Sequence, residues 1–95
     1  MIGVVAKIKV KDGMGRQFEE VATQLAAAVN ANEPDCLLYV LNRTEDPNLY
    51  VFMEQYKDQA AVENHRKQEH FRRLGRAMGE FMDGPPDILR MQSVD

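Results

Sequence analysis

The sequence predicts an α+β domain in which one four-stranded antiparallel sheet arises from the order strand, helix, strand, strand, one or two helices, strand. Three observations predict it. A strand pattern opens the chain at 2–10, and a short apolar segment at 88–94 closes it. Apolar residues recur every three or four positions at 14–30 and again at 69–82, which is typical of amphipathic helices. Two apolar runs joined by turn formers lie between these helices.

The first strand, at 2–10, is apolar at every even position, while lysines enter at the odd positions. A turn is expected at Asp12-Gly13. In the helix at 14–30, charged and amide side chains separate the apolar positions. Pro34 ends this region, because proline lacks the backbone N–H and restricts the residue before it.

The apolar runs at 36–42 and 49–56 are predicted to pair as an antiparallel hairpin across the turn-rich segment 44–48. Both alternating faces of these strands are largely apolar. A sheet covered on one side only would show a polar outer face. We therefore expect a partner subunit to cover the second face, giving a homodimer through the sheet face.

The C-terminal half completes the domain. Asp58 is suited to cap a helix, and a further helix is expected over 69–82, with a kink near Gln68 between the two. A glycine and two prolines then stop the helix before the last strand. The complete order is the ferredoxin-like split βαβ pattern, here βαββ(αα)β, in a single domain over residues 1–95.

Composition excludes several classes of partner. Twelve basic and 15 acidic residues give a net charge of −3, so no nucleic-acid or membrane partner is expected. The apolar start of the chain is interrupted by lysines and lacks a cleavage site, so it is interpreted as a strand and not as a signal. The single cysteine, Cys36, cannot form an internal disulfide, which favours the cytoplasm. A chain of 95 residues buries only about two-thirds of its surface on folding, which favours an oligomer.

Metal and cofactor sites are not predicted. His65 and His70 lie five positions apart, which rotates them by about 140° on an unbroken helix, and only a helix break would bring them together. The glycines match neither the dinucleotide nor the phosphate-loop spacing. Cys36 starts an apolar strand and is interpreted as a structural thiol.

Glu54 and His65 are the candidate catalytic residues. Alternation places Glu54 on a strand face that otherwise presents Tyr50, Phe52 and Tyr56. A carboxylate among aromatic rings must be paired, hydrogen-bonded or shifted in pKa. His65 follows on the next helix, and imidazole titrates near neutral pH. The alternatives are a strand-end glutamate that reaches solvent or an arginine, and a structural histidine.

Two features of the last helical region also have alternative interpretations. Gly75 and Gly79 permit either close backbone packing or a cavity beside the apolar residues of that helix. A basic cluster forms either a solvated helix face or a rim that binds phosphate or carboxylate. This cluster consists of Arg66, Lys67, Arg72, Arg73 and Arg76.

The segment EDPNLYVFMEQYKD at 45–58, followed by Ala60-Ala61, His65, His70-Phe71 and the Gly-Pro-Pro at 84–86, resembles the antibiotic biosynthesis monooxygenase (ABM) family. The resemblance covers nearly the whole chain. It implies a small dimeric ferredoxin-like α+β barrel that oxygenates phenolic or quinol substrates without metal or flavin. A base would remove a proton from an acidic hydroxyl, and the electron-rich anion would react with O2 in a pocket between sheet and helices.

The resemblance also assigns roles. His65 matches the family's helix histidine and is the candidate base, and Glu54 matches the strand-end acid that would orient His65 or act as a second base. Tyr56 stands where many relatives carry tryptophan, and the tryptophan and asparagine of the haem-degrading branch are missing, so haem degradation is not expected. The implied pocket lining is Tyr50, Phe52, Tyr56, Phe71, Met78 and Phe81.

Three functions stay open on the sequence. The favoured one is a cofactor-independent monooxygenase acting on a small quinol or polyphenol. The second is an isomerase that moves protons in a small hydroxyketone or its phosphate, suggested by the basic cluster. The third is a non-catalytic dimeric ligand-binding domain, which a packed core beside His65 and a surface ion pair at Glu54 would favour.

Overall fold

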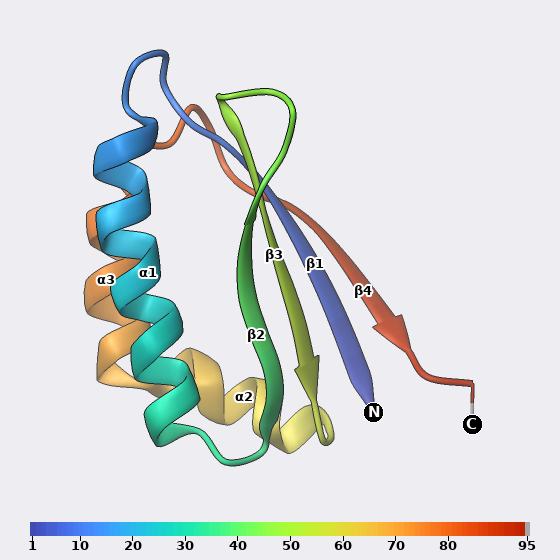
Figure 1. Ribbon diagram of the computed structural model, residues 1–95. Coiled ribbons are helices and arrows are strands. Elements are labelled where there is room, and N and C mark those ends of the chain that lie inside the picture. Colours follow the sequence, from blue (N-terminus) through green and yellow to red (C-terminus); the bar gives the residue numbers. More distant parts are fainter. Residues whose placement is uncertain (95) are drawn as a thin grey trace.

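This computed structural model describes residues 1–94, which form one antiparallel sheet and three helices. The sheet order is β2-β3-β1-β4. Figure 1 shows the helices on one face of the sheet. These features confirm the ferredoxin-like α+β fold. The elements are β1 (Ile2–Lys9), α1 (Gly15–Asn32), β2 (Cys36–Arg43), β3 (Leu49–Tyr56), α2 (Gln59–Lys67), α3 (Glu69–Gly79) and β4 (Asp87–Gln92).

The α1 helix lies between the predicted turn at Gly13 and the predicted stop at Pro34. Gly13 adopts a positive φ of 79° in the turn before the helix, a conformation that glycine adopts without steric cost. The helix ends at Glu33, whose φ of −120° and ψ of 85° are non-helical, as the following Pro34 requires. The helix is therefore two residues longer than the periodicity predicts at this end.

The expected cap and kink are both present in the C-terminal half. The Asp58 side chain accepts a hydrogen bond from the backbone N–H of Ala61 at 2.9 Å. Gln68 is extended, with φ −67° and ψ 139°, and it separates α2 from α3. The α3 helix stops at Gly79, short of the predicted end at position 82, because the chain turns back there and Met82 forms an isolated bridge with Val10.

The core lies between the sheet and the helices. One stripe of α1 is wholly buried against it and comprises Phe18, Ala22, Leu25 and Val29. A second, smaller cluster forms beneath α2, where Val62 packs with Val4 and Tyr56. The helices therefore cover only the sheet face that carries the even positions of β1.

The opposite face of the sheet is apolar and carries no helix. In register, Leu89 of β4 lies beside Val5 of β1, Val5 beside Met53 of β3, and Met53 beside Val40 of β2. Leu89 is 57% exposed and Met53 is 48% exposed. The predicted second apolar face is therefore present, and we call this row, with the neighbouring Leu38 and Met91, the outer sheet face.

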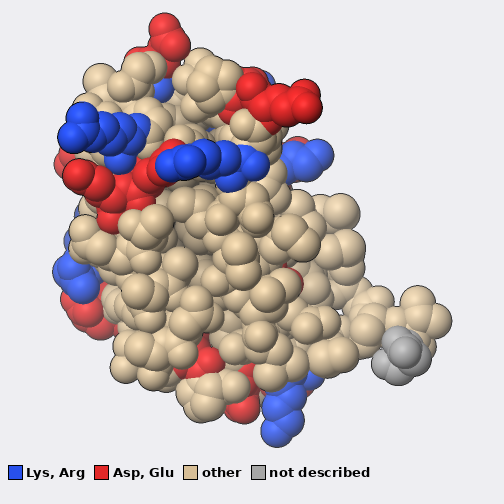
Figure 2. Space-filling view, in the orientation of Figure 1, with Lys and Arg blue, Asp and Glu red and all other residues tan. Residues whose placement is uncertain are grey.

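Charge is unevenly distributed over the molecule. Figure 2 shows charged side chains gathered at the end where the β1–α1 turn and the β2–β3 hairpin lie, with few across the middle of this view. Within residues 1–94, none of the helices is both long enough and apolar enough to cross a membrane.

Candidate active site

A cavity of about 430 Å³ opens between the sheet and the two short helices α2 and α3. The strands β1 and β3 form its floor. Its volume falls within the usual range of about 300–1,000 Å³ for small-molecule sites. The helix side is lined by Val62, His65, Phe71, Gly75 and Met78.

Most of the predicted site residues lie in the wall of this cavity. They are Phe52, Glu54, Tyr56, His65, Phe71 and Met78. Tyr50 and Phe81 are not among the described residues that line it. The prediction that these two line the pocket is therefore corrected.

Tyr50 is held elsewhere by its hydroxyl group. It donates a hydrogen bond to Glu19 of α1 at 2.5 Å, and Arg43 binds the same carboxylate through two hydrogen bonds of 2.7 and 2.9 Å. These two donors lower the pKa of Glu19 to about 2. Tyr50 is on the predicted face of β3, but it lies roughly 13 Å along the strand from Glu54. Phe81 instead packs against the main core beyond the end of α3.

His65 is buried in the cavity wall, with only 4% of the residue exposed. Its ring lies 4.4 Å from that of Phe71 and 5.2 Å from that of Tyr39, measured between centroids. Its Nδ1 lies 2.9 Å from Oε1 of Glu33. The prediction that Glu54 orients this histidine is therefore wrong, because Glu33 occupies that position.

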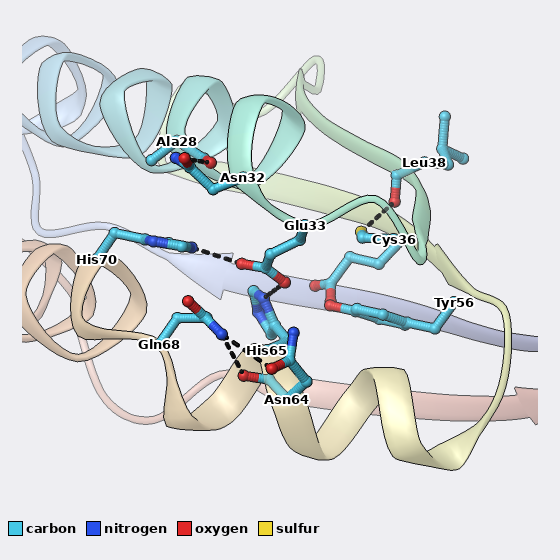
Figure 3. Close-up of polar contacts among 11 residues, drawn as sticks. Ala28, Asn32, Glu33, Cys36, Leu38, Tyr56, Asn64, His65, Gln68 and His70 are labelled. Atoms are coloured by element: carbon cyan, nitrogen blue, oxygen red, sulfur yellow. Dashed lines mark hydrogen bonds and ion pairs between the residues drawn. The ribbon is translucent and has the colours of Figure 1, made fainter.

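Glu33 connects both histidines of the chain. It is the C-cap residue that directly follows α1, and its side chain is only 2% exposed. Its Oε2 lies 2.5 Å from Nε2 of His70, while Oε1 contacts His65 (Figure 3). The two histidines converge because Gln68 interrupts the helix between them. A buried carboxylate needs such donors, because burying a polar group away from water is costly unless it is hydrogen-bonded.

Sequence reasoning did not find Glu33. The available signal was weak: an acidic residue directly before Pro34, at the point where an amphipathic helix ends. Among residues 1–94, no group of three or more His, Cys, Asp or Glu side chains is placed to hold a metal ion.

The protonation of His65 follows from its surroundings. Burial lowers the pKa of His65 below its usual value, and this effect outweighs the attraction of Glu33 for the imidazolium. The ring is therefore neutral at pH 7, with its proton on Nδ1, where it is donated to Glu33. No described residue forms a hydrogen bond with Nε2 of His65. Every fully buried side-chain nitrogen or oxygen of the described residues has a partner, so Nε2 is not fully buried. Since His65 lines the cavity, Nε2 is open to it.

Glu54 is the acidic group in the cavity wall. Its Oε1 accepts a hydrogen bond of 2.6 Å from the hydroxyl of Tyr56. Burial raises the pKa of Glu54 to about 7, although Tyr56 and the charge of Arg90 act in the opposite direction. Glu54 therefore exchanges a proton near neutral pH and is not held in a surface ion pair.

Two further predictions concern Cys36 and the glycines. Burial raises the pKa of the Cys36 thiol to about 11, which supports its interpretation as a structural residue. A Cβ atom added at Gly75 or Gly79 would meet no heavy atom of the described chain within 4 Å, so close backbone packing is not the reason for either glycine. Gly75 lines the cavity, and its missing side chain adds to the space there.

Comparison with known proteins identifies the family. Residues 1–77 match the family described as "Antibiotic biosynthesis monooxygenase" (ABM). The chain belongs to the ABM family. The matched region contains Glu33, Glu54, His65 and His70.

Similar ABM and related proteins cover the full fold. A "putative antibiotic biosynthesis monooxygenase" from Caulobacter crescentus CB15 is 40% identical, with a TM-score of 0.94 over 99% of this chain and 90% of that chain. Another solved antibiotic biosynthesis monooxygenase is 28% identical, with a TM-score of 0.91 over the whole of both chains. The "Putative monooxygenase YcnE" of Bacillus subtilis (strain 168) is 28% identical over 97% of each chain. These relatives support a general monooxygenase-like role.

Proposed function

We propose that this ABM protein is a cofactor-independent monooxygenase that oxidises a small quinol or polyphenol with O2 in the cavity. One observation carries the proposal. A neutral imidazole, His65, is fixed by Glu33 at Nδ1 and leaves Nε2 open to a cavity with aromatic walls. This is the arrangement that a general base needs to remove a proton from a phenol.

The proposed reaction needs only the substrate and O2. Nε2 of His65 takes the phenolic proton, and the phenolate gives electrons to O2 as a C–O bond forms at a ring carbon. His65 returns its proton to the resulting peroxide. The ring carbon then loses its hydrogen as a proton and the O–O bond breaks, so that one oxygen stays as a carbonyl. The other leaves as hydroxide and takes that proton to become water.

The other wall residues have proposed roles in this reaction. We assign to Glu54 the removal of the proton from the ring carbon, because it lines the cavity and its raised pKa of about 7 suits proton transfer near neutral pH. Tyr56 positions Glu54 through its hydroxyl group. Phe52, Phe71 and Met78 would contact the substrate ring as apolar walls.

Oxygen uptake with a panel of hydroquinones and polyphenols tests the proposal. We expect the wild-type protein to consume O2 and to place one atom of ¹⁸O2 in the quinone product. His65→Ala should lower the rate roughly 100-fold or more. An unchanged rate in a folded His65→Ala protein, or no uptake with any member of the panel, would rule out the assignment.

A proton-transferring isomerase is the second candidate, and four arginines in the cavity wall favour it. Such an enzyme would exchange solvent deuterium into a phosphorylated hydroxyketone without O2. The absence of exchange across a substrate panel would count against it. A non-catalytic domain would show a packed core beside His65 and a surface ion pair at Glu54. Instead a cavity lies beside His65, and Glu54 is half-buried and hydrogen-bonded to Tyr56.

We also propose that a second copy of the chain covers the outer sheet face. Met53 and Leu89 are large, apolar and about half exposed there, and a monomer has no helix to cover them. Sedimentation of Met53→Lys and Leu89→Lys should show monomers. Met14→Lys is the control, since Met14 is exposed at the start of α1 and not on this face. Monomeric wild-type protein would contradict the proposal.

The proposed setting of the reaction is the cytoplasm. Cys36 is the sole cysteine of the chain, so no intramolecular disulfide is available to stabilise it in an oxidising compartment. Fractionation of cells that produce the protein tests this proposal.

A further inference from the structure

Four arginines line the cavity from three different elements. Arg66 lies at the end of α2, Arg72 and Arg76 lie on α3, and Arg90 lies on β4. All four residues are exposed, so they surround the opening of the cavity and not its floor. Within residues 1–94, none of them makes an ion pair or a side-chain hydrogen bond. Among the described residues, the lining contains a single acidic one, Glu54.

We propose that the ligand of this cavity carries an anionic group, a carboxylate or a phosphate, which these arginines bind at the opening. The guanidinium group is planar and presents paired N–H donors that match both groups. The inference rests on the proposed function only for the aromatic part of the ligand, which occupies the apolar interior.

The spacing on α3 provides a place for the anion. Arg72, Gly75 and Arg76 are separated by three and four positions and therefore share one face of the helix, and all three line the cavity. Like charges one turn apart repel each other, and no described acid forms an ion pair with either arginine. Gly75 adds no side chain between them, and a Cβ there would meet nothing within 4 Å. An anion can therefore approach the helix between the two guanidinium groups.

The paired arginines of the protein lie outside the cavity. Arg73, next to Arg72 on α3, binds Glu69 at 3.0 Å and does not line the cavity. Arg43 binds Glu19 at 2.7 Å in the other half of the molecule. Of the two arginines of α3 that line the cavity, neither is paired within the described chain, whereas the α3 arginine outside it, Arg73, is.

The charges of these arginines also reach the polar groups of the site. Arg66 disfavours the imidazolium of His65, and Arg90 favours the carboxylate of Glu54. A bound anion would therefore change the charge that acts on both residues. This links the occupancy of the opening to the chemistry in the interior.

Anaerobic calorimetry with matched pairs of ligands tests the inference without turnover. Hydroquinone is compared with 2,5-dihydroxybenzoate, and phenol with phenyl phosphate. We expect at least one anionic member to bind roughly tenfold or more tightly than its neutral partner, with an advantage that falls as salt is added. Arg72→Gln combined with Arg76→Gln should abolish the advantage. Arg73→Gln, which removes the same charge from the same helix outside the cavity, should keep it.

Each binding result tests only whether the ligand carries an anionic group and does not test the proposed reaction. A tighter carboxylate or a tighter phosphate supports the inference and identifies the group. Equal binding of both pairs overturns it, as does an advantage that survives in the Arg72→Gln, Arg76→Gln protein or disappears in Arg73→Gln. Oxygen uptake with neutral hydroquinone is measured separately. If the anionic ligands show no advantage, the proposed monooxygenase activity is therefore unaffected. If no oxygen is consumed, the proposed anion binding is unaffected.

Discussion

Oε1 of Glu33 lies 2.9 Å from Nδ1 of His65, and this contact joins the end of α1 to the candidate base on α2. Pro34 ends α1 at this point, so the backbone break that makes Glu33 the C-cap of the helix also fixes the position of its carboxylate. The candidate site therefore depends on how α1 docks beside α2 and α3.

Glu33→Gln should slow turnover, because the proton of His65 would no longer be fixed on Nδ1. An amide can present either a donor or an acceptor to Nδ1, so the proton is no longer held there. We expect oxygen uptake to fall roughly 10- to 1,000-fold. Loss of the carboxylate also removes a group that raises the pKa of His65, so the acidic limb of the rate profile should move to lower pH.

The matched control for this change is Glu20→Gln, an exposed residue on the same helix. It should leave both the rate and the pH profile unaltered. A Glu33→Gln protein that keeps the wild-type rate and profile would show that Glu33 has only a structural role.

Glu54→Gln should remove a pH-dependent loss of stability. Burial raises the pKa of Glu54 from 4.5 to about 7, so between these values the folded chain holds a proton that the unfolded chain has released. The stability of the wild-type protein therefore falls as the pH rises through this window and levels off above it. The variant should gain up to about 3 kcal/mol relative to wild type over the same window.

Urea unfolding of both proteins at about pH 5 and about pH 8 measures this difference. The lowered pKa of His65 produces a trend of opposite sign, but it is common to both proteins and cancels. Glu45→Gln, on the exposed hairpin, should show no such dependence. A difference that is constant with pH would contradict the raised pKa of Glu54.

Gly75→Leu should reduce the space available to the ligand. The helix should form more readily, because glycine in a helix interior is about 0.5–1 kcal/mol less favourable than other helix formers. The leucine side chain would enter the cavity and should weaken binding of an aromatic ligand about tenfold or more. Gly79→Leu, outside the described lining, should leave affinity unchanged, and equal affinities of both variants would argue against the proposed ligand position.

Tyr50→Phe should affect stability and not turnover. It removes the hydrogen bond to Glu19 but retains the ring contact with Phe18, whose centroid lies 5.0 Å away. The expected loss is about 1–3 kcal/mol in the free energy of unfolding, since the acceptor is charged. Thermal unfolding and oxygen uptake check the two parts, and a large fall in uptake would return Tyr50 to the site.

The strands and helices could be predicted because each is determined by the pattern of residues adjacent in the sequence. Period two placed Phe52, Glu54 and Tyr56 on one face of β3, and all three line the cavity. The same alternation placed Tyr50 there, but it fixes only the face and not the distance along the strand. A competing carboxylate on α1, Glu19, then determined where that hydroxyl group lies.

The histidines show the same limit on a helix. Their spacing predicted that His65 and His70 point in different directions on one helix. The extended backbone at Gln68 breaks that helix, and both rings contact Glu33. The sequence by itself determined the order of elements, the two apolar faces of the sheet and the candidate base. Only the tertiary structure decided that Glu33 is the carboxylate hydrogen-bonded to His65 and that Gly75 is the glycine lining the cavity. Periodicity is a local property of the backbone, whereas a buried hydrogen bond between Glu33 and His65, 32 positions apart, depends on how two helices pack on the sheet.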